Sequence, residues 1–159
     1  MSYIRLANLF DLYTVGDTGR ESVLKRYNNA TPLEVVSYNG ANYTYLSFIY
    51  QGASKNRTGD NLEAQLIFSA NQISTGFARE AVTKRQLVRV YSALMTKDNK
   101  VEKILTTEDW VAASLSYDCE TLEVILSSSI DAVGANAPTR VLTREIVGNL
   151  PVTGNINAV

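Results

Sequence analysis

The sequence predicts a mainly β fold: an antiparallel β-sandwich or a small β-barrel with one or two short helices and an extended C-terminal arm. Short segments rich in β-branched and aromatic residues follow one another at intervals of about 8–12 residues, separated by polar turns. No regular alternation of strand and helix patterns is present, which argues against a parallel doubly wound sheet. Because the chain has 159 residues, we expect one β-rich domain over residues 1–130, followed by the arm at 131–159.

The first expected hairpin is centred on Asn39-Gly40, a dipeptide that favours tight turns between strands. Segments 33–38 and 43–50 flank it and carry β-branched and aromatic residues. Ala41 and Asn42 leave open a loop of more than two residues. A polar stretch follows at 51–61, and a loop of that length in a compact domain is either mobile or functional.

The remaining elements follow from periodicity. Ile73, Phe77 and Ala81 are spaced as on one face of a helix, and Gly76 weakens that helix, so we expect it to be short. The beginning of the chain, at 4–24, is compatible with a short helix or a strand. The expected later elements are a strand at 62–70, the helix at 72–84, and strands at 86–95, 101–106, 110–117 and 121–128.

The last thirty residues differ in character from the rest. They contain two of the three prolines, Pro138 and Pro151, together with several glycines and few charges. Such a segment is too apolar for a solvated linker and too irregular for a helix. We therefore expect an extended arm that lies on a surface, either of its own domain or of a neighbouring subunit.

Composition excludes several functions. Fifteen basic and sixteen acidic residues give a net charge of -1, so no broad cationic field exists for nucleic acid or a membrane surface. The chain has no histidine, which excludes a Ser-His-Asp triad or a histidine metal site within it. Cys119 is the one cysteine and forms no internal disulfide or cysteine-rich metal site. We expect no cofactor and no metal. The N-terminus lacks the pattern of a signal peptide, so we expect synthesis in the cytoplasm.

Catalytic motifs are weak. The tripeptide Asp17-Thr18-Gly19 matches the aspartic-protease motif, but the preceding residues make a poor apolar strand, and a turn explains it better. Phosphate-binding glycine motifs do not occur. We expect a protein without enzymatic activity and without catalytic residues.

Tyrosines outnumber the other aromatic residues, with nine tyrosines against four phenylalanines and one tryptophan. Tyr43 and Tyr45 belong to the cluster in the first expected hairpin. They are either ordinary strand aromatics or part of a protein contact surface. Because 35–50 contains no arginine or lysine, stacking on nucleic-acid bases is not expected there.

The last two-thirds of the chain resembles tailed-phage proteins near the tip of the tail. The resemblance rests on AVTKRQLVRVY at 81–91, WVAASLSYD at 110–118, LEVILSSSID at 122–131 and NAPTRV at 136–141. The group includes the minor tail protein L of lambda-like phages and a related phage family of otherwise unknown function. By this resemblance Asp131, Pro138 and Arg140 mark the start of the closing arm. Lambda-like L proteins are longer and carry a cysteine-ligated iron–sulfur domain. With Cys119 alone, this chain is expected to lack that cluster.

The resemblance implies a structural virion protein, a tail-tip or baseplate hub or adaptor that joins the tail tube to distal host-facing components. Its expected partners are other tail and baseplate proteins and further copies of itself in a closed ring of three-fold or six-fold symmetry. The alternatives are another tail subunit (tube, tail-completion or connector) and a small non-catalytic binding module. The expected subunit-interface residues are Tyr43, Tyr45, Gly59, Asp131, Pro138, Arg140, Arg144 and Pro151.

Overall fold

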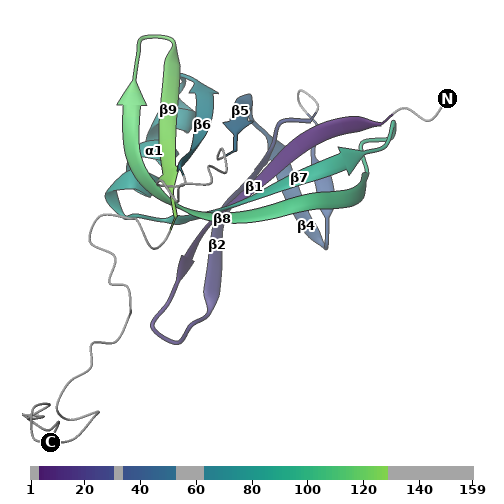
Figure 1. Ribbon diagram of the computed structural model, residues 1–159, viewed down its shortest axis with the longest axis horizontal. Helices are drawn as coiled ribbons and strands as arrows, with labels where there is room; N and C mark the ends of the chain where they lie inside the picture. The colour runs from purple at the N-terminus through teal and green to yellow at the C-terminus, as the bar shows by residue number, and fades with distance from the viewer. Residues whose placement is uncertain (1–3, 31–33, 53–62, 129–159) are drawn as a thin grey trace, which may run out of the picture.

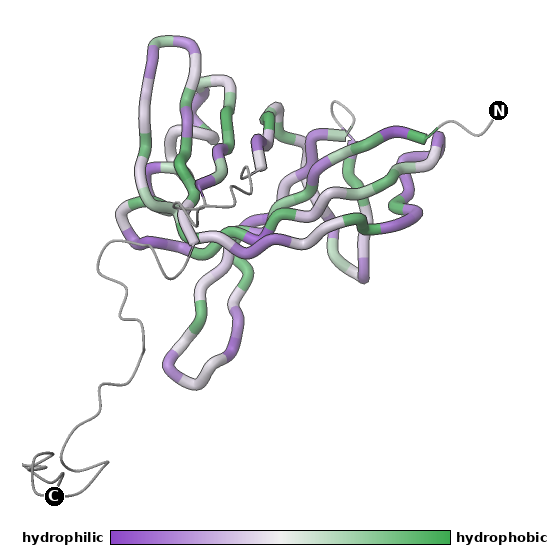
Figure 2. The backbone as a smooth tube through the Cα atoms, in the orientation of Figure 1, coloured by the Kyte–Doolittle hydropathy of each residue, from purple (hydrophilic) through white to green (hydrophobic). Residues whose placement is uncertain are grey.

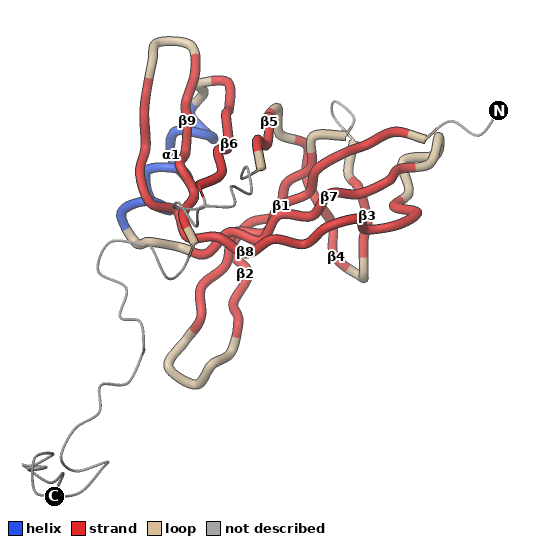
Figure 3. Tube along the Cα trace, viewed as in Figure 1, coloured by secondary structure: helices blue, strands red, loops and turns tan. Residues whose placement is uncertain are grey.

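The computed structural model describes residues 4–30, 34–52 and 63–128, which form one nine-stranded sheet and one helix (Figures 1 and 3). The strand order in the sheet is β3-β4-β2-β1-β7-β8-β9-β6-β5. The elements are β1 (Arg5–Val15), β2 (Glu21–Asn28), β3 (Val36–Tyr38), β4 (Ala41–Tyr45), β5 (Phe48–Gln51), β6 (Glu63–Ser69), α1 (Gln72–Thr83), β7 (Leu87–Met95), β8 (Val101–Tyr117) and β9 (Thr121–Ser127).

The long strand β8 belongs to both halves of the sheet. Its first part pairs with β7 and its last part pairs with β9. The change of partner strand occurs at Val111, which pairs with Leu87 of β7 on one side and with Ser127 of β9 on the other. A bulge between Ala112 and Ser114 follows at once, and bulges bend the strand that carries them. The sheet therefore turns along β8, as Figure 1 shows.

The main core fills the space inside this bend. Phe10 on β1 is fully buried, and its ring lies 4.9 Å from that of Phe48 on β5 and 6.0 Å from that of Phe68 on β6. Tyr27 and Phe77 complete the group of packed rings. Because β1 and β2 of one half of the sheet meet β5 and β6 of the other half at Phe10, the two halves pack face to face, as in a sandwich.

A second, smaller core lies on the opposite face of β1 and β7. Leu9, Ala93 and Met95 are buried there beneath the β3–β4 hairpin, which contributes Val36 and Tyr43. Alternate side chains of a strand point to opposite faces, so Leu9 belongs to this core while its neighbour Phe10 belongs to the main one. The β3–β4 hairpin is thus fixed over one face of the central strands.

Local turn chemistry explains the ends of the hairpins. Asn39 and Gly40 have φ values of 51° and 76°, and Tyr38 pairs directly with Ala41, so the β3–β4 loop has two residues in a left-handed turn. At the β7–β8 turn Asn99 also has a positive φ, of 57°. Figure 2 shows hydrophilic residues at the tips of the β1–β2, β7–β8 and β8–β9 hairpins, which fits their exposure to solvent.

Helix α1 is closed at both ends by backbone and side-chain hydrogen bonds. The Asn71 side chain accepts from the Ser74 backbone and the Ser74 hydroxyl accepts from the Asn71 backbone, which is a capping box. At the other end the Gln86 N–H donates to the Ala81 carbonyl, while Arg85 has φ 47°, a conformation that favours glycine. The helix buries Phe77, Ala78 and Ala81 and covers the β8–β9 end of the sheet.

The structure confirms a mainly β, sandwich-like fold with one short helix and corrects several details. The sheet is mixed rather than antiparallel, because β2 and β4 are parallel, and it does not close into a barrel. The N-terminal segment forms strands β1 and β2. Segment 43–50 divides between β4 and β5, and 110–117 continues β8 rather than forming a strand of its own. The expected arm at 131–159 lies outside the described residues. No helix of the described part is long and apolar enough to span a bilayer.

Candidate functional site

Four charged residues form a row across the centre of the sheet, on the face that carries the smaller core. Strand register places Arg26 of β2 beside Asp11 of β1, Asp11 beside Arg89 of β7, and Arg89 beside Asp109 of β8. The signs alternate along the row, and opposite charges on directly paired residues stabilise a sheet. We call these four residues the charged row.

Arg89 is the most strongly held member of the row. Its Nε donates to the Asp109 carboxylate at 2.7 Å, and its terminal nitrogens donate to both carboxylate oxygens of Glu21 at 3.0 and 3.1 Å. The guanidinium carbon lies 4.8 Å from the centre of the Tyr13 ring. Tyr13 in turn donates its hydroxyl hydrogen to Asp109. The hydrogen bond from Arg89 lowers the pKa of Glu21, so both groups are charged at neutral pH.

Asp11 is buried at the centre of the row. Burial raises its pKa, although the hydrogen bond from Tyr43 and the charges of Arg26 and Arg89 oppose that rise. The Asp11 Oδ1 and the Arg26 Nε are 3.7 Å apart, and neither atom has a hydrogen-bond partner among the described residues. Desolvation also raises the pKa of Tyr43, with Asp11 contributing, so Tyr43 stays protonated and keeps its role as donor.

A hollow of about 200 Å³ opens over this part of the sheet. We call it the Asp11 hollow. Its floor and walls come from β1, β2, β7 and the β3–β4 hairpin. The residues that line it include Asp11, Arg26, Tyr38, Tyr43, Arg89 and Tyr91. The Tyr38 and Tyr91 rings are 5.9 Å apart and tilted by 59°, so they stand as two walls at an angle. The hollow combines aromatic walls with two acidic and two basic side chains.

A second polar contact joins β5 to β8 on the other face of the sheet. Trp110 donates from Nε1 to the Tyr50 hydroxyl at 3.1 Å, and Tyr50 donates to the Glu108 carboxylate. Burial and the hydrogen bond to Glu108 raise the pKa of Tyr50, which keeps the hydroxyl protonated. This chain of bonds ties an edge strand to the centre of the sheet, so we interpret it as structural.

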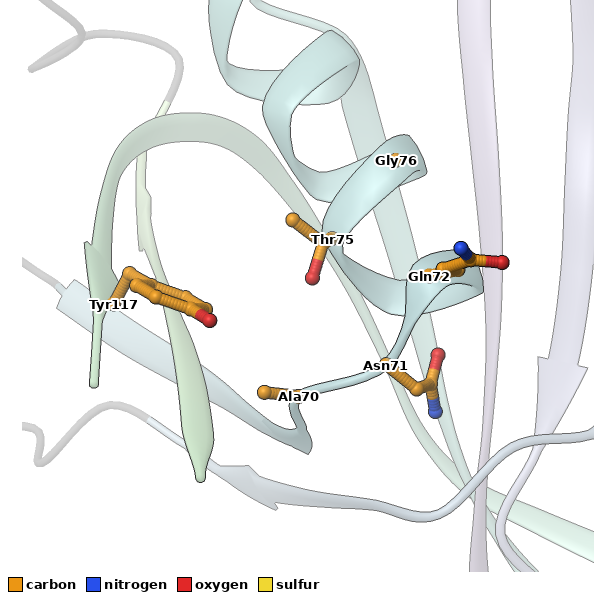
Figure 4. A pocket seen from close by; sticks show the side chains of 6 residues that line it. All are labelled: Ala70, Asn71, Gln72, Thr75, Gly76 and Tyr117. Carbon is orange, nitrogen blue, oxygen red and sulfur yellow. The ribbon is translucent and has the colours of Figure 1, made fainter. Parts of the chain in front are cut away.

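A larger and more open hollow, of about 440 Å³, lies beside the first turn of α1 (Figure 4). Tyr117 at the end of β8 faces Thr75 and Ala70 across it. Asn71 and Gln72 also line it, but Asn71 is engaged in the capping box. No buried charged side chain lines this hollow among the described residues, so it offers shape without a specific recognition group.

The expected interface residues fall into two groups. Tyr43 is only 2% exposed and packs in the smaller core, so its ring contacts this chain rather than forming the half-buried surface that the sequence suggested. Tyr45 is half-buried at the end of β4. The other expected interface residues lie outside the described part: Gly59, Asp131, Pro138, Arg140, Arg144 and Pro151.

The residues of the weak protease-like motif and the one cysteine are at hairpin ends. Asp17, Thr18 and Gly19 are exposed in the β1–β2 turn, and the Gly19 N–H donates to the Gly16 carbonyl there. Cys119 is exposed in the β8–β9 turn. Within residues 4–30, 34–52 and 63–128, no group of three or more acidic or cysteine side chains is arranged to hold a metal ion.

Sequence reasoning missed the charged row and the Asp11 hollow. A signal was present, because Asp11 and Arg89 each interrupt an otherwise apolar strand pattern. Only the strand register shows that the two residues are neighbours. No family model matches the chain, and comparison with curated proteins finds no significant match.

Proposed function

We propose that this chain is a structural virion protein of a tailed bacteriophage. In this proposal it is a tail-tip or baseplate hub or adaptor subunit that joins the tail tube to distal host-facing components. It acts by packing against neighbours, without catalysis, in a closed ring of its own copies and in contact with other tail proteins. The resemblance of segments 81–91, 110–118 and 122–131 to tail-tip proteins supports this role.

The observation that carries the proposal concerns the three paired strands β1, β7 and β8, which we call the β1–β7–β8 ribbon. One face of this ribbon is covered by other parts of the chain at its outer end and the opposite face is not. At its outer end one face is buried beneath the β3–β4 hairpin, which covers Ala7 and Met95. The opposite face leaves Leu6 62% exposed, and Ile4 just before β1 is 55% exposed. Leu94, the register partner of Leu6, is half-buried beside it. Adjacent apolar side chains left in water are typical of a surface that a partner covers.

The sheet also has two ends that suit assembly. β3 and β5 are the terminal strands of the order, so each has one edge without a strand partner among the described residues. Ile49 on β5 and Val35 before β3 are exposed at these edges. Open edges with apolar residues promote pairing with another chain, and in a ring each subunit can meet the next by such a contact. The proposed arm at 131–159 and Gly59 belong to the same expected interface.

Copy number in purified particles tests the proposal directly. We expect quantitative mass spectrometry to find about three or six copies per virion, as a single closed ring requires. A value in the tens or hundreds would overturn the hub assignment and favour a tube subunit. Absence from the particle would overturn both structural roles and favour a small binding module.

A pair of variants tests the surface that carries the proposal. Leu6→Ser removes an exposed side chain from the uncovered face, whereas Ile73→Ser removes an equally exposed one from α1. Both leave the cores intact. We expect Leu6→Ser to reduce incorporation into particles and self-association in light scattering, and Ile73→Ser to leave both unchanged. Equal behaviour of the two variants would show that the uncovered face is not the contact.

A further inference from the structure

We propose that the Asp11 hollow is a binding site for a neutral, hydroxyl-rich ligand, namely one sugar ring of a carbohydrate. The site is built from five strands, β1, β2, β3, β4 and β7. It is separate from the uncovered face of the ribbon, because Asp11 lies on the face that carries the smaller core. The inference therefore does not depend on the proposed function.

Two buried polar atoms beside the hollow, one on Asp11 and one on Arg26, have no hydrogen-bond partner among the described residues. The Asp11 side chain is only 9% exposed, yet its Oδ1 accepts no hydrogen bond from a described residue, and the Arg26 Nε donates none. Leaving buried polar atoms without partners costs about 1–3 kcal/mol for each group, so a ligand that reaches these two atoms from the hollow gains by hydrogen-bonding them. A hydroxyl fits both, because it donates to a carboxylate and accepts from a guanidinium.

The volume of the hollow and the freedom of the Arg26 side chain to turn indicate what kind of molecule supplies that hydroxyl. A water molecule occupies roughly 30 Å³ in the liquid, so a hollow of about 200 Å³ holds more than a single bridging water. The two unpartnered atoms are closed to solvent, so a ligand reaches them only when the Arg26 side chain turns. Arg26 can turn because its side chain is 37% exposed and its ion pair with Asp11 spans 3.7 Å.

Charge balance argues for a neutral ligand. Asp11 and Glu21 contribute two negative charges to the lining, and Arg26 and Arg89 contribute two positive charges. Arg89 is already bound on both sides by Glu21 and Asp109. An anion would meet the carboxylates and a cation would meet the guanidinium groups. A polyol is repelled by neither the carboxylates nor the guanidinium groups, because it is uncharged and each of its hydroxyls can serve as donor and acceptor.

The aromatic walls supply the remaining recognition. Tyr38 and Tyr91 are half-buried, and their rings stand at an angle of 59°. Tyrosine rings offer a flat apolar surface with a polar hydroxyl at the edge. This combination matches a sugar ring, which has an apolar C–H face and a rim of hydroxyls.

Titration of the ¹⁵N-labelled full chain by NMR tests the site. The probes are the methyl glycosides of glucose, galactose, mannose and N-acetylglucosamine, with sodium sulfate and arginine methyl ester as charged comparisons. We expect at least one glycoside to shift the amides of Asp11, Arg26 and Tyr91 saturably, with a Kd of about 1–10 mM. Neither charged probe should do so. No saturable shift with any glycoside, or a shift of these amides by a charged probe instead, would overturn the proposal.

Three variants make the assignment specific. Arg26→Gln removes the donor that faces Asp11, and Asp11→Asn replaces the carboxylate acceptor by an amide of the same shape. Each should weaken glycoside binding at least fivefold, since hydrogen bonds to charged groups are about twice as strong as neutral ones. Lys25→Gln makes the same charge change one position earlier in β2, on the opposite face, and should leave the Kd unchanged. Equal binding by Arg26→Gln and Lys25→Gln would show that the ligand sits elsewhere.

Discussion

Asp11 and Arg26 are direct partners across β1 and β2, with the Asp11 Oδ1 and Arg26 Nε 3.7 Å apart and neither atom hydrogen-bonded to a described residue. The pair is therefore close enough for electrostatic attraction but lacks the contact that would offset the burial of Asp11. This explains why burial raises the pKa of Asp11 despite two neighbouring arginines.

The first prediction concerns Asp11→Asn. Because the folded-state pKa of Asp11 is raised, folding disfavours its charged form at neutral pH. A neutral amide of the same shape removes this penalty, so we expect the variant to be more stable at pH 7, by on the order of 1 kcal/mol. The advantage shrinks as pH falls through the raised pKa and toward the ordinary value of 3.8, because wild-type Asp11 then takes up a proton.

Urea unfolding of both proteins at pH 7 and near pH 4 measures this difference. Asp109→Asn is the matched control, since Asp109 is an exposed member of the charged row with a 2.7 Å bond from Arg89. It should lower stability at pH 7 rather than raise it. A destabilised Asp11→Asn at pH 7 would mean that attraction to the arginines outweighs desolvation.

The second prediction concerns Arg89→Lys. Lysine keeps the charge but cannot hold Glu21 with two nitrogens and Asp109 with a third. We expect amide hydrogen exchange in the outer part of the β1–β2 hairpin to accelerate about fivefold, because Glu21 anchors that part to β7. Amide exchange in β9 should not change, because β8 separates β9 from the strand that carries Arg89. Uniform acceleration across the sheet would indicate global destabilisation instead.

The third prediction concerns Arg85→Gly. Arg85 has φ 47° just after α1, where glycine avoids the strain that a side chain brings. Replacement by glycine should raise the free energy of unfolding by about 1 kcal/mol. Arg85→Ala removes the same side chain but keeps the Cβ atom, so it should give no comparable gain. Thermal unfolding of the two variants separates backbone strain from loss of the arginine.

The fourth prediction compares two side chains on the same face of β1. Phe10 is fully buried against rings from β2, β5, β6 and α1, whereas Leu6 is exposed. Phe10→Ala should cost about 3–5 kcal/mol and leave the isolated chain partly unfolded. Leu6→Ala should change the stability of the monomer by less than about 0.5 kcal/mol. Circular dichroism during denaturant unfolding tests both. A large effect at Leu6 would show that this residue packs in a core.

Elements with strong local signals were predictable from the sequence. The spacing of Ile73, Phe77 and Ala81 predicts α1, and Asn39-Gly40 predicts the β3–β4 turn. The break expected before 110 was wrong for a physical reason. Glu108 and Asp109 resemble turn residues, but in β8 they are polar because they accept from Tyr50 and Arg89 on opposite faces.

The candidate site was less accessible to sequence reasoning, because its members are distant in the chain. Arg26, Asp11 and Arg89 meet only through the pairing of β2, β1 and β7, and no local pattern specifies that register. Tyr43 illustrates the same limit. Its tyrosine-rich context suggests a surface, whereas the fold places the hairpin over Leu9 and Ala93 and buries the ring.

The shared strand β8 has a consequence for how this protein moves. Since Val111 pairs with both β7 and β9, the two halves of the sheet share one continuous strand in addition to the β4–β5 connection and α1. Any change in their relative tilt is elastic bending of one continuous strand, concentrated at the bulge beside Ala113. A displacement of the β8–β9 hairpin is therefore passed along the backbone of β8 to the strands β7 and β1 that pair beside it.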